Sequence, residues 1–120
     1  MNSHNTGQHY EALACSFLEQ QGLTLLTSNF HSRLGEIDLI MLDGDTLVFI
    51  EVRFRQASQF ASAAESITQA KQQRIINTAK MFLAKNKAYQ QCFCRFDVIA
   101  IELDSAEEAQ YHWLKAAFTE

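Results

Sequence analysis

The chain has 120 residues, of which 48% are apolar and 20% are charged, and its formal net charge is −4. This length suffices for one domain with a single core, and the composition is that of an ordinary globular protein. No apolar run approaches the roughly 18 residues that span a bilayer, and residues 1–8 lack the features of a secretory signal. Three cysteines, an odd number, argue against a disulfide framework and predict a reduced, cytoplasmic setting without a membrane.

The charge is distributed unevenly along the chain. Residues 1–52 carry −6, residues 53–95 carry +7, and residues 96–120 carry −5. This pattern predicts a basic surface beside an acidic site, which is the arrangement that a phosphodiester and a metal ion would require. The alternative is that the basic residues only decorate the solvated face of one helix.

The first half of the chain predicts one helix followed by three strands. Apolar residues recur at helical spacing over Tyr10–Gln20, and Gly22 follows as a helix stop. Leu23–Phe30 is typical of a strand. Glu36–Leu42 and Thr46–Arg55 are rich in β-forming residues and flank Asp-Gly-Asp, which predicts a hairpin.

The second half predicts a helix and at least one further strand. Residues 56–66 are small and polar and indicate a mobile connection, whereas Ile67–Lys85 has the period of a helix with Thr68 as its N-cap. Cys92–Leu103 is typical of an inner strand, and Tyr111–Phe118 is either a late strand or a helical turn. We therefore expect one α/β domain over residues 1–120, with helices packed on a mixed sheet.

The hairpin predicts a cluster of carboxylates. A two-residue loop at either Asp43-Gly44 or Gly44-Asp45 places Asp38 on the same face as Glu51, and strand alternation adds Glu36 and Arg53. Only an odd-length loop or a bulge would separate these side chains. Like charges on neighbouring strands repel, so the cluster requires a cation, either Arg53 or a hard ion such as Mg²⁺ or Mn²⁺. The alternative is a solvated face on which the acids simply alternate with the core.

The hairpin segments, GEIDLI at residues 35–40 and VFIEVRFR at residues 48–55, resemble the YraN family of small uncharacterised bacterial proteins. The resemblance extends over residues 7–118 through further matching positions: Gly7, Glu11, Ala14, Asn29, Phe30, Arg33, Lys71, Ile75 and residues 94–98. That family is similar in turn to PD-(D/E)xK nucleases, and especially to archaeal Holliday-junction resolvases. The resemblance therefore implies a restriction endonuclease-like, three-layer fold with a central mixed sheet and a hairpin at about 35–55.

The resemblance also implies the site. Asp38 matches the first metal-binding aspartate, and Glu51 matches the acidic residue of the D/E-x-K element. The metal would be Mg²⁺ or Mn²⁺, held by these carboxylates and the Val52 carbonyl, with Glu11 assisting. Arg53 stands at the lysine position and stays protonated, so it grips a phosphate but takes no proton from water. Lys71 is the alternative source of the missing lysine.

Four residues are expected to support this site, namely Glu36, Lys71, Arg95 and Asp97. Arg95 and Asp97 lie two apart on one strand, and they pair either with the site or with each other. Nucleic acid, DNA rather than RNA, would be bound by Arg33, Arg55, Lys71 and Arg74. The expected function is a metal-dependent endonuclease for structured or branched nucleic acid, and a homodimer is one of the expected assemblies. The alternatives are an inactive module that binds nucleic acid or a repair partner, and a fold-only interaction protein.

Overall fold

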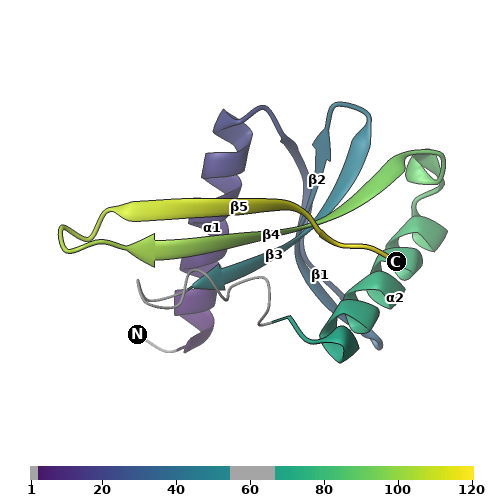
Figure 1. The fold of residues 1–120 in the computed structure, drawn as a ribbon. Coiled ribbons are helices and arrows are strands. Elements are labelled where there is room, and N and C mark those ends of the chain that lie inside the picture. The colour runs from purple at the N-terminus through teal and green to yellow at the C-terminus, as the bar shows by residue number, and fades with distance from the viewer. Residues whose placement is uncertain (1–2, 55–66) are drawn as a thin grey trace.

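The protein folds into five strands and two long helices, which a computed structural model describes for residues 3–54 and 67–120 (Figure 1). In chain order the elements are α1 (Ser3–Gln20), β1 (Thr24–Ser32), β2 (Gly35–Asp43), β3 (Thr46–Phe54), α2 (Gln69–Lys85), the 3-10 turn η2 (Lys87–Tyr89), β4 (Phe93–Leu103) and β5 (Ala109–Phe118). The predicted connection at residues 56–66 and the predicted contact residue Arg55 lie outside the described residues.

The strands form one mixed sheet in the order β1-β2-β3-β4-β5. β3 and β4 are parallel, and the other neighbouring pairs are antiparallel. A parallel connection requires a crossover, and the segment between β3 and β4 contains α2, which packs back onto the sheet. The sheet also decides two predictions. The late segment at residues 111–118 is a strand, which was the first of the two predicted alternatives, and Cys92–Leu103 is confirmed as an inner strand.

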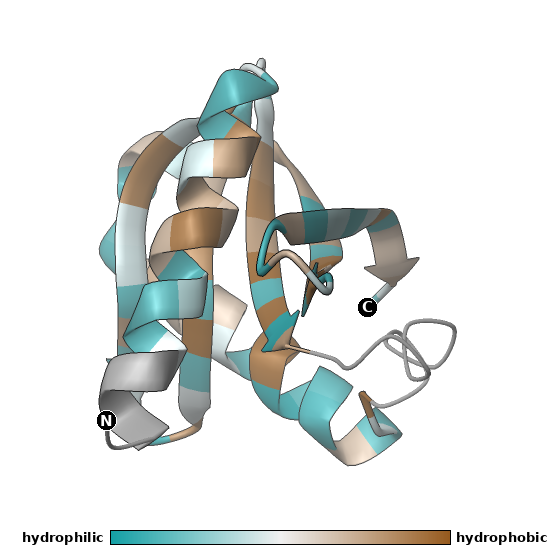
Figure 2. Ribbon diagram, turned by 90° about the vertical axis from the view of Figure 1, so that its left-hand side faces the viewer, coloured by the Kyte–Doolittle hydropathy of each residue, from teal (hydrophilic) through white to brown (hydrophobic). Residues whose placement is uncertain are grey.

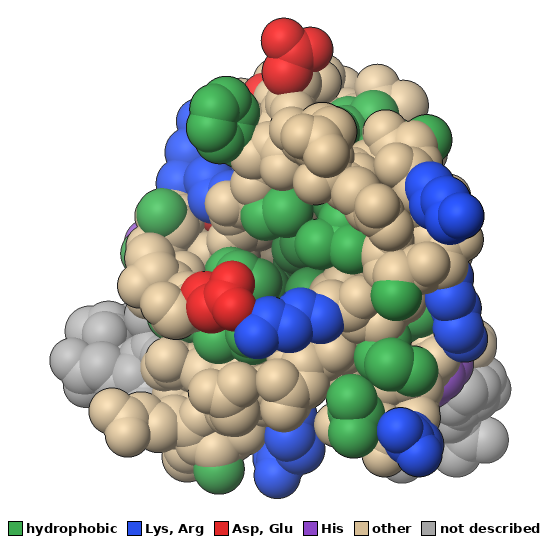
Figure 3. Space-filling model, turned by 90° about the vertical axis from the view of Figure 1, so that its right-hand side faces the viewer, with side chains coloured by type: hydrophobic (Ala, Val, Ile, Leu, Met, Phe, Trp, Pro, Cys, Tyr) green, Lys and Arg blue, Asp and Glu red, His purple; other side chains and the backbone are tan. Residues whose placement is uncertain are grey.

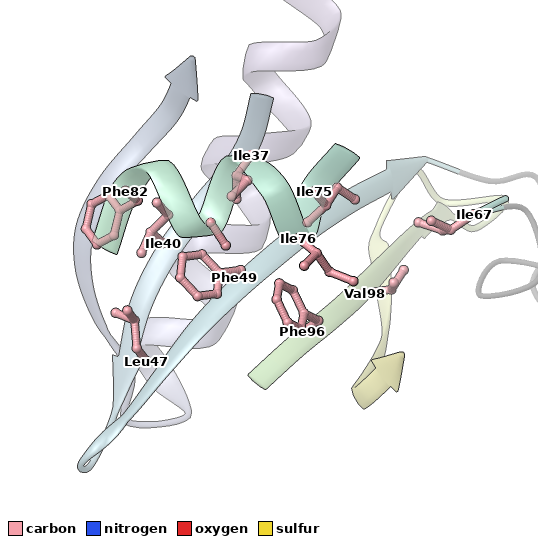
Figure 4. Close-up of a cluster of buried hydrophobic side chains, with 11 residues drawn as sticks. Ile37, Ile40, Leu47, Phe49, Ile67, Ile75, Ile76, Phe82, Phe96 and Val98 are labelled. Atoms are coloured by element: carbon pink, nitrogen blue, oxygen red, sulfur yellow. The ribbon is translucent and has the colours of Figure 1, made fainter. Parts of the chain in front are cut away.

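A helix covers each face of the sheet. On one face, α2 contributes Ile75, Ile76 and Phe82 to a buried cluster that includes Phe49 and Phe96 of the sheet (Figure 4). On the other face, Ala14 and Leu18 of α1 pack against Leu39, Val48 and Ile50, and Figure 2 shows α1 in front of strands rich in apolar residues. We call these the α2 face and the α1 face. The predicted three-layer α/β fold is confirmed.

The β2–β3 turn sets the register that the candidate site requires. Asp43 pairs with Thr46, so the loop consists of Gly44 and Asp45, and Gly44 has a φ of 61°, which favours glycine. This is the second of the two registers considered above. The ladder ends at the Leu39–Ile50 pair, so Asp38 and Glu51 come next on their two strands.

Both helix starts differ from the prediction. α1 begins at Ser3, seven residues before the predicted start; its first two turns are polar and lack the apolar period on which the prediction depended. α2 begins at Gln69, two residues after the predicted start at Ile67. The predicted N-cap of α2 is confirmed, since the Thr68 hydroxyl accepts a hydrogen bond from Lys71 N at 3.1 Å. Within residues 3–54 and 67–120, neither helix combines the length and apolar character that crossing a bilayer requires.

Candidate metal and phosphate site

Two buried carboxylates lie on neighbouring strands at the open end of the β2–β3 hairpin. Asp38 on β2 is 8% exposed and Glu51 on β3 is 7% exposed. They directly follow the Leu39–Ile50 pair, which is the last pair of the β2–β3 ladder. The hairpin therefore brings together the two acids that the sequence analysis selected.

The Asp38 side chain takes part in the strand pairing itself. Its Oδ2 atom accepts a hydrogen bond from the backbone N–H of Val52 at 2.8 Å. Burial, and then the negative charge of Glu51, raise the pKa of Asp38 from 3.8 to about 8; the Val52 hydrogen bond opposes the rise, and Glu11 adds to it. Asp38 therefore holds a proton near neutral pH unless a cation displaces it.

Among the residues that the structure describes, Glu51 has two cationic neighbours. The ammonium Nζ of Lys71 lies 2.9 Å from Glu51 Oε1, and Nη2 of Arg53 lies 3.8 Å from the same oxygen. Lys71 belongs to the first turn of α2, whose start is held by the Thr68 cap. The nearer cation is thus the Lys71 ammonium of α2, and the guanidinium of Arg53, two residues after Glu51 on β3, is farther away.

Glu11 reaches the same carboxylates from the α1 side. Its carboxyl group raises the pKa of Asp38, so the two groups are close. The Glu11 Oε1 atom is buried and has no hydrogen-bond partner within the described part of the chain. Glu11 also lines a cavity of about 310 Å³ between α1, β1 and β2. An unpaired buried oxygen of this kind is a vacant acceptor for a cation or a proton donor.

A second cavity, of about 210 Å³, opens between α2 and the hairpin and is lined by Gly35, Glu36, Glu51, Lys71, Arg74 and Ile75. Gly35 permits this close approach, because a Cβ atom there would lie 3.1 Å from Thr78 Oγ1 and the φ of 148° favours glycine. Two of the predicted nucleic-acid contacts, Lys71 and Arg74, therefore share a cavity with Glu51.

Two other predicted residues lie further out. The Glu36 side chain is 54% exposed and Oε2 lies 3.0 Å from His31 Nδ1, so its carboxylate is directed to β1 although it borders the cavity. Ile37 packs on the α2 face and Leu39 on the α1 face, so the alternation of side chains is interrupted at Asp38. Glu36 still borders the same cavity as Glu51. Arg33 is exposed in the β1–β2 turn.

Arg95 and Asp97 form a separate network with each other, the second of the predicted alternatives. Asp97 is 1% exposed and accepts hydrogen bonds from Arg95 Nε and Nη2, from Trp113 Nε1 and from the Ala116 N–H, at 2.9 to 3.0 Å. Arg95 Nη2 also lies 3.0 Å from Asp43 Oδ2. Asp43 and Trp113 were not predicted as partners of this pair. The sequence indicated only that a buried carboxylate on a strand needs several hydrogen-bond donors.

The donor set has the chemistry of a site for a hard divalent ion, but its geometry is not that of a closed metal site. Carboxylate oxygens of Glu11, Asp38 and Glu51 are the ligands that Mg²⁺ and Mn²⁺ prefer, and Glu11 Oε1 is unpaired among the described residues. However, no three acidic, cysteine or histidine side chains in the described ranges are arranged as a ready-made metal site. Lys71 already neutralises Glu51, so an ion binding there would compete with that ammonium.

The sequence matches one family of proteins over most of its length. The model of the uncharacterised protein family UPF0102 matches residues 10–101. A UPF0102 protein of Vibrio cholerae is 47% identical over 123 aligned positions, which cover 100% of this chain and 97% of the relative.

Other curated relatives agree. A UPF0102 protein of Alcanivorax borkumensis is 46% identical over 95% of this chain and 91% of its own, and one of Francisella tularensis is 45% identical over 98% and 97%. The chain belongs to family UPF0102, and the resemblance to the YraN family is thereby confirmed.

Proposed function

We propose that this member of the UPF0102 family binds nucleic acid at the Asp38–Glu51 site and hydrolyses its phosphodiester bonds with a divalent metal ion. The observation that carries the proposal is the pair of buried carboxylates, Asp38 and Glu51, with the Lys71 ammonium 2.9 Å from Glu51. Two acids and a lysine at one strand end correspond to the residue types of the PD-(D/E)xK nucleases, which the hairpin motif resembles.

The roles follow from charge and position. Asp38 and Glu51 would hold Mg²⁺ or Mn²⁺ together with the Val52 carbonyl, and Glu11 would contribute from α1. A bound ion would act as a Lewis acid toward the phosphate and stabilise the charge that develops on it. Lys71 and Arg53 would orient a phosphate oxygen, the guanidinium through its planar donor pair. Arg74, on the wall of the same cavity, would contact a neighbouring phosphate.

Lys71, not Arg53, takes the place of the usual lysine in this proposal. The ammonium Nζ is 2.9 Å from Glu51 Oε1, whereas the guanidinium Nη2 is 3.8 Å away. An ammonium is also the group whose protonation responds to its surroundings, while a guanidinium stays charged. Lys71→Met should therefore reduce cleavage more than Arg53→Met, with both variants retaining the fold.

A module that binds nucleic acid without cleaving it is the second candidate. It is favoured by the ion pair between Lys71 and Glu51, because the ammonium neutralises the Glu51 charge without a metal ion. Two cationic side chains beside a single cavity would still bind a phosphate in that case. The two candidates share their binding residues and differ in whether the carboxylates hold a metal.

Cleavage and metal binding separate these candidates. Labelled single-stranded, duplex and four-way-junction DNA and RNA would be incubated with Mn²⁺ or EDTA, using wild type and Glu51→Gln. Calorimetric titration with Mn²⁺ would be run in parallel on wild type, Asp38→Asn and Glu51→Gln.

We expect cleavage that requires Mn²⁺ and is lost in Glu51→Gln, and metal binding that is lost in both carboxylate variants. Glu36→Gln is the matched control, because Glu36 borders the same cavity but is directed to His31. Binding of an oligonucleotide without cleavage would establish the second candidate. Unchanged Mn²⁺ affinity in Asp38→Asn and Glu51→Gln would refute the metal site.

A further inference from the structure

One residue of β1 has a backbone conformation that strands rarely adopt. Asn29 has a φ of 53°, in the left-handed region, although it lies within the strand Thr24–Ser32. In the described part of the chain, the other residues with a side chain and a positive φ are Glu107, in the β4–β5 turn, and Ala116 of β5. Asparagine enters this region more readily than most residues, but the conformation still costs free energy. A strained residue inside a strand therefore needs a structural reason.

The strained residue of β1 lies level with Asp38 on the neighbouring strand β2. On one side of this level, Ser28 pairs with Leu39. On the other side, Phe30 pairs with Ile37, and no register shift separates the two pairs. The left-handed residue of β1 and the candidate metal ligand of β2 therefore occupy the same level of the ladder.

Both strands change the face of the sheet at this level. Opposite residues of an antiparallel ladder share a face, and in a regular ladder the pair two residues further along shares it too. Here the Ser28–Leu39 pair lines the cavity on the α1 face, whereas the Phe30–Ile37 pair packs on the α2 face, where Figure 4 shows Ile37. The left-handed φ of Asn29 and the interrupted alternation at Asp38 thus belong to one distortion, which we call the crease.

The crease directs the Asp38 carboxylate between the two faces. Beyond the last pair of the β2–β3 ladder, Asp38 Oδ2 accepts the hydrogen bond from Val52 N–H of β3 at 2.8 Å. The carboxyl group is also close to Glu51, which borders the cavity beside α2, and to Glu11 of α1. In a regular strand the side chain would stand on one face, which would take it away from one of these two acids.

We propose that Asn29 is a positioning residue, whose left-handed backbone forms the crease and thereby holds the Asp38 carboxylate between the two faces of the sheet. Asn29 lines the same cavity as Glu11, so the crease lies at the wall of the candidate site. Its consequence for metal binding rests on the proposed function, in which Asp38 shares an ion with Glu51 and Glu11. Asparagine suits this position because its short polar side chain lowers the cost of a positive φ.

Hydrogen exchange at the Val52 amide tests the position of Asp38 without a metal ion. The ¹⁵N-labelled full chain would be exchanged in EDTA, with the amide of buried Val48 in the same strand as the reference. Asn29→Gly should keep wild-type protection, because glycine adopts a positive φ freely. Asn29→Val should lower the protection of Val52 relative to Val48 by about tenfold, because a β-branched residue opposes this φ and the amide loses its acceptor.

Two further variants separate the crease from a general loss of stability. Asn29→Ala should lie between the glycine and valine variants, and it keeps the comparison available if the valine variant does not fold. Glu107→Val places the same β-branched side chain at a φ of 62° in an exposed turn. It should lose stability while keeping the wild-type ratio of Val52 to Val48 protection.

Titration calorimetry with Mn²⁺ then measures the consequence for the candidate metal site. Asn29→Val should bind Mn²⁺ about 10- to 100-fold more weakly than wild type, which is the usual effect of disturbing a group that orients a metal ligand. Asn29→Gly and Glu107→Val should bind Mn²⁺ as wild type does.

Wild-type protection of Val52 in Asn29→Val would overturn the inference, and so would equal losses of protection in Asn29→Gly and Asn29→Ala. If Mn²⁺ binding is lost in Asp38→Asn but unchanged in Asn29→Val, the metal site stands without the crease. If wild type binds no Mn²⁺ while Val52 protection falls from Asn29→Gly to Asn29→Val, the crease stands and the metal site does not. The failure of the inference and the failure of the proposed function are therefore distinguishable.

Discussion

Asp38→Asn should make the metal-free protein more stable at alkaline pH. Asp38 is 8% exposed, and burial and the charge of Glu51 raise its pKa from 3.8 to about 8. The native state therefore holds a proton that the unfolded chain has already lost over this window. Stability falls with rising pH wherever the native state binds more protons, so wild type loses stability between about pH 4 and pH 8. In Asp38→Asn no carboxyl group titrates at this position, so this loss of stability with rising pH is absent.

The size of the effect follows from the same pKa. One pKa unit corresponds to 1.36 kcal/mol, so the free energy of unfolding of wild type should fall relative to Asp38→Asn by about 3 kcal/mol between pH 5.5 and pH 8. Little further change is expected above pH 9. The asparagine Oδ1 still accepts the hydrogen bond from Val52 N–H, so the strand pairing survives the substitution.

Urea unfolding followed by circular dichroism at half-unit steps from pH 5.5 to 9, with EDTA present, measures this difference. Asp45→Asn is the control, because Asp45 is exposed in the hairpin turn and its substitution should give a constant offset. In Glu51→Gln the pH dependence should shrink, since the charge of Glu51 is the second largest cause of the raised pKa of Asp38. A difference between wild type and Asp38→Asn that stays flat across this range would refute the burial argument.

Two further predictions concern the frame around the site. Asp97→Asn should lower the free energy of unfolding by about 3–5 kcal/mol in urea unfolding, because Arg95 loses its charged partner and an amide NH₂ replaces one of the two oxygens that accept from Arg95, Trp113 and Ala116. A loss below about 1 kcal/mol would show that the network contributes little. Thr68→Ala should lower it by about 1 kcal/mol through the lost cap, while Thr68→Ser should retain it, and equal stability of the two would contradict the capping role.

The hairpin and its acids were predictable because their determinants are local. Turn chemistry at Gly44 limits the loop to two residues, and the register that follows ends with the Leu39–Ile50 pair, next to Asp38 and Glu51. The pairing of Glu36 with His31 was not predicted, and the interruption of the alternation at Asp38 is visible only in the tertiary packing of Ile37 and Leu39.

The partners of the predicted residues depended on contacts between distant segments. Asp43 meets Arg95 across 52 positions of sequence, and Trp113 meets Asp97 across 16. No periodicity connects such residues. Likewise, the charge along the chain does not reveal which basic side chains are paired: Lys80 pairs with Glu120 at 2.7 Å, and Arg95 pairs with Asp43 and Asp97. Figure 3 shows Lys and Arg side chains spread around a hollow in which hydrophobic side chains gather.

Under the proposed function, the position of Lys71 would explain why arginine occupies the position at which PD-(D/E)xK nucleases have lysine. α2 brings the Lys71 ammonium to 2.9 Å from Glu51 Oε1, and the Thr68 cap fixes where the helix starts. Position 53 then need not supply an ammonium. The guanidinium of Arg53 is suited to binding a phosphate, because it has two parallel N–H donors. The chemistry of this site therefore depends on the groups that meet at Glu51. The spacing of residues along β3 gives Glu51 and Arg53 but not Lys71, which comes from α2.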